Sequence, residues 1–177
     1  ASAAPANAVS MAEVLRAIYN AVSADSAADD VTVQAGLGKR VTKVGDVASA
    51  PDDLFTVTGK CLITLMVGEV TSVIATTSSI QLQSSTGSII IAASTDITSD
   101  AAGTLYLVTG DPDDTLNGDV TTIPNVDVAW AQTGQTSPFM VNDDRIYQAV
   151  NGAGTGTIQW DLFYIPLEAS ATIASSA

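Results

Sequence analysis

From Val31 onward, the chain repeatedly alternates valine, isoleucine or leucine with threonine or serine in short runs. A period of two residues places apolar side chains on one face of a strand and polar side chains on the other. Turn residues such as glycine and asparagine separate the runs, and no helical pattern stands between them. Many short strands without helices between them predict a mainly β fold, with an antiparallel β-sandwich or jelly-roll-like domain over residues 31–168.

The predicted strands differ in length and in the faces they present. They are 40–47, 55–67, 70–75, 80–84, 88–93, 104–109, 126–131, 139–141, 146–150 and 157–165. In segment 55–67, one face is predicted to carry Phe55, Val57, Cys61, Ile63, Leu65 and Val67, with Gly59 marking a bulge. Cys61 is therefore expected in the core and not as a reactive thiol.

The last predicted strand, 157–165, is apolar on both faces at its end. Ile158, Trp160, Leu162 and Tyr164 share one face, whereas the other face ends in Phe163 and Ile165. A strand that is apolar on both sides is expected in the centre of a sheet or at a subunit interface. The low-complexity residues 169–177 that follow are predicted to form a flexible C-terminal tail.

Residues 1–30 follow a different pattern and are predicted to form an arm, a short α-helix and a linker. Ser10 and Glu13 fit a capping box at the start of this helix. An apolar stripe then recurs at helical spacing: Met11, Val14, Leu15, Ile18, Tyr19 and Val22. A short helix needs a packing partner in water, so we expect this stripe to dock on the β domain or to associate with copies of itself.

Composition excludes several classes of function. The chain has no histidine and one cysteine among 177 residues, which removes a Ser-His-Asp or Cys-His system and a conventional zinc site. The formal net charge of −13 opposes binding to nucleic acid. No apolar run is long enough for a membrane span. Paired carboxylates such as Asp143–Asp144 do not by themselves supply the facing acid and base of a glycosidase, so we predict a non-enzymatic protein without a cofactor.

Two charged segments are candidate binding sites. An acidic stretch resembles part of a calcium loop, although it lacks the terminal glutamate of an EF-hand; its residues are Asp111, Asp113, Asp114, Asn117 and Asp119. The alternative for this stretch is an acidic turn that simply faces water. The basic stretch contains Lys39, Arg40 and Lys43 and departs from a phosphate-binding loop, so we interpret it as a docking site for an acidic neighbouring subunit.

Several phrases of the sequence resemble small structural proteins of tailed-bacteriophage particles. They are DDLFTVTGKCLITLMVGEVTSVI, AAGTLYLVTGD and the closing GTGTIQWDLFYIPLEASATI. The resemblance implies a capsid decoration (cement) or head-fibre protein at the surface of the virion. It also implies partners: copies of the same chain, as a homotrimer, and the major capsid protein or another virion protein. The alternatives are a phage tail component and a carbohydrate-binding or adhesive sandwich, the latter with or without calcium.

Overall fold

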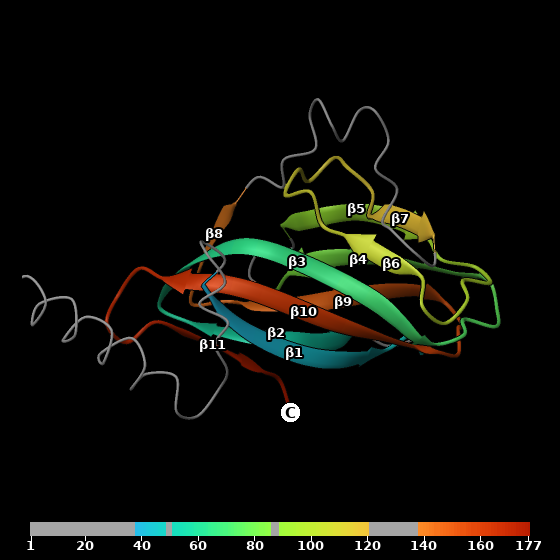
Figure 1. Cartoon of the computed structure of the whole chain (residues 1–177), viewed down its shortest axis with the longest axis horizontal. Helices are drawn as coiled ribbons and strands as arrows, with labels where there is room; N and C mark the ends of the chain where they lie inside the picture. The colour runs from blue at the N-terminus through green and yellow to red at the C-terminus, as the bar shows by residue number, and fades with distance from the viewer. Residues whose placement is uncertain (1–37, 49–50, 86–88, 121–137) are drawn as a thin grey trace, which may run out of the picture. The chain divides into compact units, whose positions relative to one another are not determined.

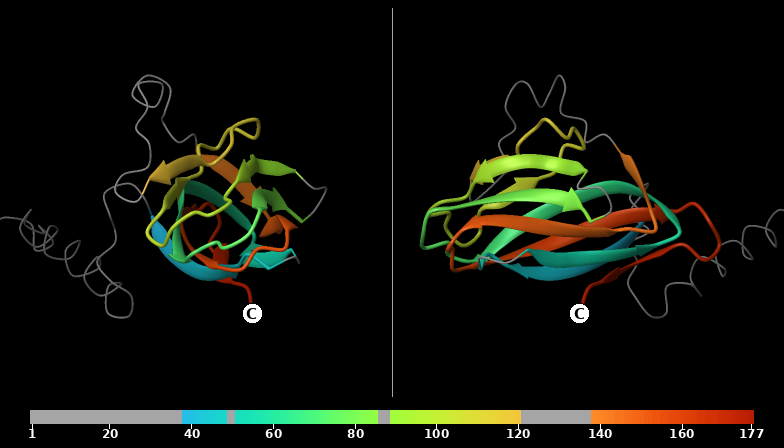
Figure 2. Two further views of the ribbon diagram at one scale, coloured as in Figure 1. Left: turned by 90° about the vertical axis from the view of Figure 1, so that its right-hand side faces the viewer. Right: turned by 180° about the vertical axis from the view of Figure 1, so that it is seen from behind.

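Two antiparallel sheets pack against each other, and one apolar core lies between them (Figures 1 and 2). The structure, a computed structural model, describes residues 38–48, 51–85, 89–120 and 138–177, without the side chains of 117–120. Every named element within these residues is a strand. The prediction of a mainly β fold is therefore confirmed. The predicted helix and the predicted strand 126–131 lie outside the described residues.

Sheet A faces the viewer in Figure 1 and has its longest strands in the centre. Its order is β1 (Lys39–Asp46), β10 (Thr157–Pro166), β3 (Lys60–Ser72), β6 (Leu105–Leu107) and β7 (Asn117–Val120). The short strand β8 (Phe139–Asn142) pairs with the beginning of β3. The strand 157–165 thus corresponds to β10 and has neighbours on both sides, as its two apolar faces predict.

Sheet B lies behind sheet A and is seen directly in the right panel of Figure 2. Its order is β11 (Thr172–Ser175), β2 (Asp52–Thr58), β9 (Arg145–Gly152), β4 (Ser78–Ser84) and β5 (Ile90–Asp96).

Five of the predicted strands are present with shifted ends. They are 40–47, 80–84, 104–109, 139–141 and 146–150, which correspond to β1, β4, β6, β8 and β9. Segment 70–75 is not a separate strand, because β3 continues through Ser72, and segment 88–93 is displaced to β5.

The predicted strand 55–67 is wrong as a single element, because the chain changes sheets at Gly59. Gly59 has a φ of 66°, which a residue with a side chain adopts only at a cost, and it separates β2 in sheet B from β3 in sheet A. The backbone N–H of Gly59 donates to Asp143 Oδ1 over 2.6 Å, which fixes the turn from outside. A turn therefore stands where the alternating pattern predicted a bulge.

Within β3, the alternation of faces also reverses partway along the strand. The register with β10 shifts between Phe163 and Tyr164, so Thr64 is an extra residue on β3. Phe55, Val57, Cys61 and Ile63 are buried as predicted. Beyond the shift, Met66 points into the core, whereas Leu65 and Val67 are partly exposed on the opposite face. The predicted inward position of Leu65 and Val67 is therefore wrong.

Trp160 and Gln148 join the two sheets inside the core. The Trp160 indole Nε1–H donates to Gln148 Oε1 over 2.9 Å, and the Gln148 amide donates to the Asp46 carbonyl over 2.6 Å. Both side chains are fully buried, so these bonds satisfy polar groups that water does not reach. Gly68 leaves room for the indole, because a Cβ there would lie 2.7 Å from the Trp160 ring.

The C-terminal segment corrects the prediction of a flexible tail at 169–177, because residues 172–175 form strand β11 on the edge of β2. Ala171 and Ile173 are buried and face the core. The many small residues around them hide this apolar pattern in the sequence. The Lys43 ammonium donates to the Ser176 carbonyl over 2.8 Å, and the Ser176 N–H donates to the Leu54 carbonyl over 3.0 Å. These contacts link the end of the chain to both sheets.

Candidate binding surface

Near β8, the outer face of sheet A carries a group of adjoining apolar side chains. Strand register aligns Met140 of β8 with Leu62 of β3 and Ile165 of β10. Leu65 and Phe163 form the next pair along β3 and β10. Met140 is 66% exposed, and the other four residues are partly exposed. We call these five residues the outer apolar patch. Adjoining exposed apolar side chains of this kind are typical of a surface that binds another molecule.

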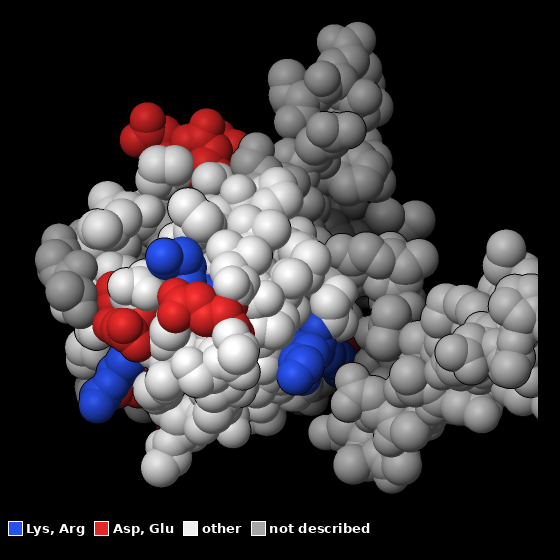
Figure 3. Space-filling model, turned by 90° about the vertical axis from the view of Figure 1, so that its left-hand side faces the viewer, with Lys and Arg blue, Asp and Glu red and all other residues white. Residues whose placement is uncertain are grey.

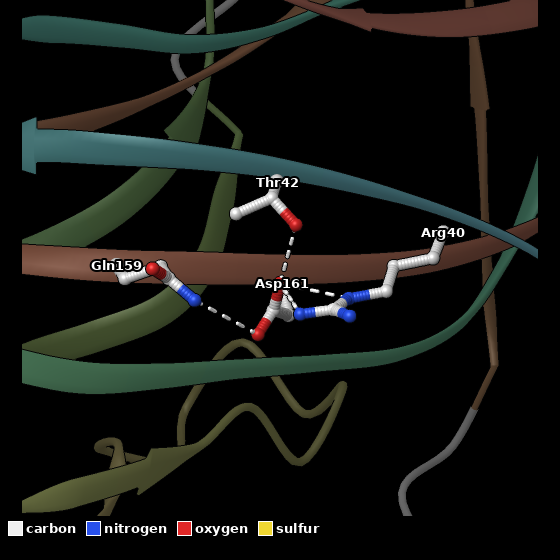
Figure 4. Close-up of polar contacts among 4 residues, drawn as sticks. All are labelled: Arg40, Thr42, Gln159 and Asp161. Atoms are coloured by element: carbon white, nitrogen blue, oxygen red, sulfur yellow. Dashed lines mark hydrogen bonds and ion pairs between the residues drawn. The ribbon is translucent and has the colours of Figure 1, made fainter. Parts of the chain in front are cut away.

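A polar cluster borders the patch, because Arg40 of β1 pairs in register with Phe163 (Figure 4). The Arg40 guanidinium donates to Asp161 Oδ1 from Nη2 over 2.7 Å and from Nε over 3.0 Å. Thr42 Oγ1 donates to the same oxygen over 2.5 Å, and Gln159 Nε2 donates to Asp161 Oδ2 over 3.5 Å. The two carboxylate oxygens thus accept from four donors. The cluster holds the edge strand β1 against β10 and places an ion pair beside the patch.

The predicted basic docking site is not one patch, because its residues point in different directions. Arg40 lies on the outer face, whereas Lys43 points to the inner side and donates to Ser176. Lys39 is exposed at the start of β1 and alternates with Arg40 along the strand. A further cation beside the patch is Lys60, which lies 3.8 Å from Glu168. In Figure 3, positive and negative groups at this end lie next to each other, with uncharged surface around them.

The outer face of sheet B is polar over β9 and β4, and Ile90 of β5, which pairs with Gln83, is 40% exposed beside them. The Tyr147 hydroxyl donates to Gln83 Oε1 over 2.7 Å, and the Gln83 amide in turn donates to Gln81. Arg145 Nη1 lies 2.9 Å from Asp53 Oδ2. Side-chain hydrogen bonds and charges of this kind are compatible with direct exposure to water.

The structure does not bring the predicted calcium ligands together within its described part. Asp111 Oδ1 accepts from the Asp113 N–H over 3.0 Å, and Asp114 Oδ2 accepts from Thr109 Oγ1 over 3.1 Å. Asn117 and Asp119 belong to β7, and their side chains are outside the description. Among the described residues, no group of three carboxylate or thiol side chains is placed to hold a metal ion. The Asp111 and Asp114 carboxylates therefore hold the turn itself.

Cys61 is a core residue, as predicted. Its side chain is fully buried in β3, and burial raises the pKa of the thiol, with the nearby Glu168 carboxylate raising it further. Both effects disfavour the thiolate, which is the reactive form of cysteine.

The outer apolar patch is the feature that sequence reasoning placed incompletely. The apolar residues on both faces of 157–165 indicate that Phe163 and Ile165 face outward. The outward position of Leu65 could not be predicted, because it depends on the register shift in β3. The predicted docking stripe (Met11, Val14, Leu15, Ile18, Tyr19 and Val22) lies outside the described residues.

Comparisons with protein-family models, with curated proteins and with solved structures give no match. In the described part of the chain, no helix has the length and hydropathy needed to cross a membrane.

Proposed function

We propose that this chain is a non-enzymatic structural protein that binds the outside of a tailed-phage particle and decorates its capsid as a homo-oligomer. The proposal includes an antiparallel β-sandwich, formed by the two sheets, and an N-terminal helix that precedes it. The outer apolar patch is the observation that supports a binding role. The phage context is supported by the phrases of sequence that resemble small virion proteins.

A structural role also agrees with how the described polar groups are used. Asp161 is engaged by Arg40 and Thr42, and Gln148 is engaged by Trp160 and a backbone carbonyl. Such groups maintain strand register and core packing. This arrangement supports a protein that adds buried area to an assembly, since binding through a preformed rigid surface loses little conformational entropy.

The direct test is to find the chain on particles. Tailed-phage particles whose genome encodes this chain are purified on a density gradient. Peptides of the chain are then sought by mass spectrometry in the particle band. The proposal predicts that the peptides travel with the particles and that immunogold labelling marks the head. Labelling of the tail would identify a tail component instead, and peptides confined to the top of the gradient would contradict both assignments.

A second experiment separates attachment from folding. Deleting residues 1–22 removes the predicted arm and helix, and we expect particle binding to be lost while the far-ultraviolet circular dichroism of the β strands is retained. Undiminished binding by the shortened chain would show that residues 1–22 are not the anchor.

A further inference from the structure

We propose that the outer apolar patch of sheet A is the surface on which a second copy of this chain packs. This inference deepens the homo-oligomer part of the proposed function and rests on it. The composition of the patch agrees with an interface core, because Phe163 and Met140 stand among aliphatic side chains and Arg40 lies beside them. Aromatic residues, methionine and arginine are enriched where proteins meet, whereas unpaired charges are depleted there.

Charge favours this surface over the rest of the molecule for contact between copies. The chain has a formal net charge of −13, so two copies repel each other over most of their surfaces. Around the patch, the two positive residues Arg40 and Lys60 stand against the three negative residues Asp161, Glu168 and Asp143, which gives a local sum of −1. Two copies therefore meet less repulsion at this surface than over the acidic remainder of the chain.

The rim of the patch also carries both signs of charge, which a self-complementary surface requires. The Lys60 ammonium and the Glu168 carboxylate lie 3.8 Å apart with half-exposed side chains, so each has room for another partner. A neighbouring copy of the same surface supplies a carboxylate for Lys60 and an ammonium for Glu168. A foreign partner with a uniformly acidic rim would bind Lys60 and repel Glu168. This difference favours a second copy as the occupant.

The decisive experiment changes one exposed side chain on the patch and a matched one elsewhere. Met140→Lys places a cation at a site that is 66% exposed, so the monomer is expected to fold. It also lowers the net negative charge, so any dissociation cannot come from stronger general repulsion. Ile89→Lys is the control, because Ile89 precedes β5 in sheet B, is 64% exposed and undergoes the same change of chemistry.

Solution mass is measured by light scattering after size exclusion over a series of protein concentrations. The wild-type chain and Ile89→Lys are expected to form the same oligomer. Met140→Lys is expected to raise the dissociation constant by about tenfold or more, because a charge is then desolvated at the contact. Met140→Leu keeps an apolar side chain and is expected to retain the oligomer. Equal urea midpoints at a monomeric concentration show that folding is unchanged.

Two results would overturn the inference: a wild-type chain that stays monomeric throughout the series, or an oligomer that survives Met140→Lys. Dissociation by Ile89→Lys alone would also overturn it, because it would place the contact at sheet B. The particle experiment distinguishes this failure from that of the proposed function. A patch-dependent oligomer that is absent from particles leaves the inference standing and removes the phage assignment, whereas a monomer found on particles does the reverse.

Discussion

The outer faces of the two sheets differ, although both sheets contribute to the same core. On sheet B, Tyr147, Gln83 and Gln81 form a row of side-chain hydrogen bonds facing water. On sheet A, the corresponding outward positions near β8 are apolar, as Leu62 and Phe163 show. One face of an antiparallel sheet is free to be polar only when nothing needs to pack on it. The contrast places the apolar side chains near β8 on the outer face of sheet A, whereas β9 and β4 of sheet B present hydrogen-bonded polar side chains.

The largest expected change in stability comes from substitutions on the inner face of sheet A, compared with substitutions on its outer face. Trp160→Ala removes a fully buried side chain that contacts both sheets, and we expect a loss of about 3–5 kcal/mol in the free energy of unfolding. Phe163→Ala, three residues away on the outer face, is expected to cost the monomer about 1 kcal/mol or less, because this side chain is partly exposed already. Urea denaturation at low protein concentration measures both. Equal losses would show that Phe163 is not a surface residue.

The next effect concerns the edge of sheet B. Removing residues 172–177 takes away β11 and the burial of Ile173, and we expect a loss of about 2–4 kcal/mol, of which the buried side chain accounts for most. Ala174→Thr is the matched control, because Ala174 is exposed on the same strand and should tolerate the change. Thermal unfolding followed by circular dichroism makes the comparison. Unchanged stability of the truncated chain would show that residues 172–177 behave as a flexible tail.

A smaller change in stability is expected from the ion pairs, one of which lies on the outer face of each sheet. The Asp161 side chain is 18% exposed and accepts two hydrogen bonds from Arg40, whereas Asp53 is 43% exposed and accepts one from Arg145. Double-mutant cycles with alanine are expected to give about 0.5–1 kcal/mol for Arg40–Asp161 and less than about 0.5 kcal/mol for Arg145–Asp53. Raising the salt concentration should weaken the second pair more. The reverse order would mean that the Arg40–Asp161 cluster does not stabilise β1 on β10.

The smallest effect should stabilise the protein. Ser78 Oγ at the start of β4 is buried and has no hydrogen-bond partner among the described residues. Ser78→Ala removes this unsatisfied hydroxyl, and we expect a gain of up to about 1 kcal/mol in the free energy of unfolding. Ser79→Ala, at the neighbouring outward position, is the control and should change little. A clear loss on Ser78→Ala would indicate that the hydroxyl is satisfied, for instance by a bound water.

Sequence reasoning predicted the elements of this fold better than their connections. Strict alternation identifies β4, β9 and β10, because each pairs with at least one neighbouring strand without a register shift. Alternation fails at Gly59, where the chain changes sheets, and at Thr64, where an extra residue in β3 reverses the faces. The run 61–67 is apolar at nearly every position, so the reversal leaves no mark in the sequence. The candidate surface was predictable only where a strand is apolar on both faces.

The basic residues show the same limit. Lys39, Arg40 and Lys43 are close in sequence, and their spacing suggests one site. Strand geometry sends Arg40 to Asp161 on the outer face and Lys43 to Ser176 on the inner side, through partners more than 100 residues away along the chain. Those partners cannot be inferred from the basic segment itself.

The sequence by itself determined that this protein is built of strands, which side of most strands is buried, and which catalytic systems its composition excludes. Hydrophobic periodicity and residue chemistry are local properties, so they can be read from a single chain. Only the tertiary structure decided that residues 172–175 pair with β2, that Leu65 faces outward, and that Met140, Leu62 and Ile165 form one surface. These outcomes depend on strand register between distant segments, which is set when the whole core packs.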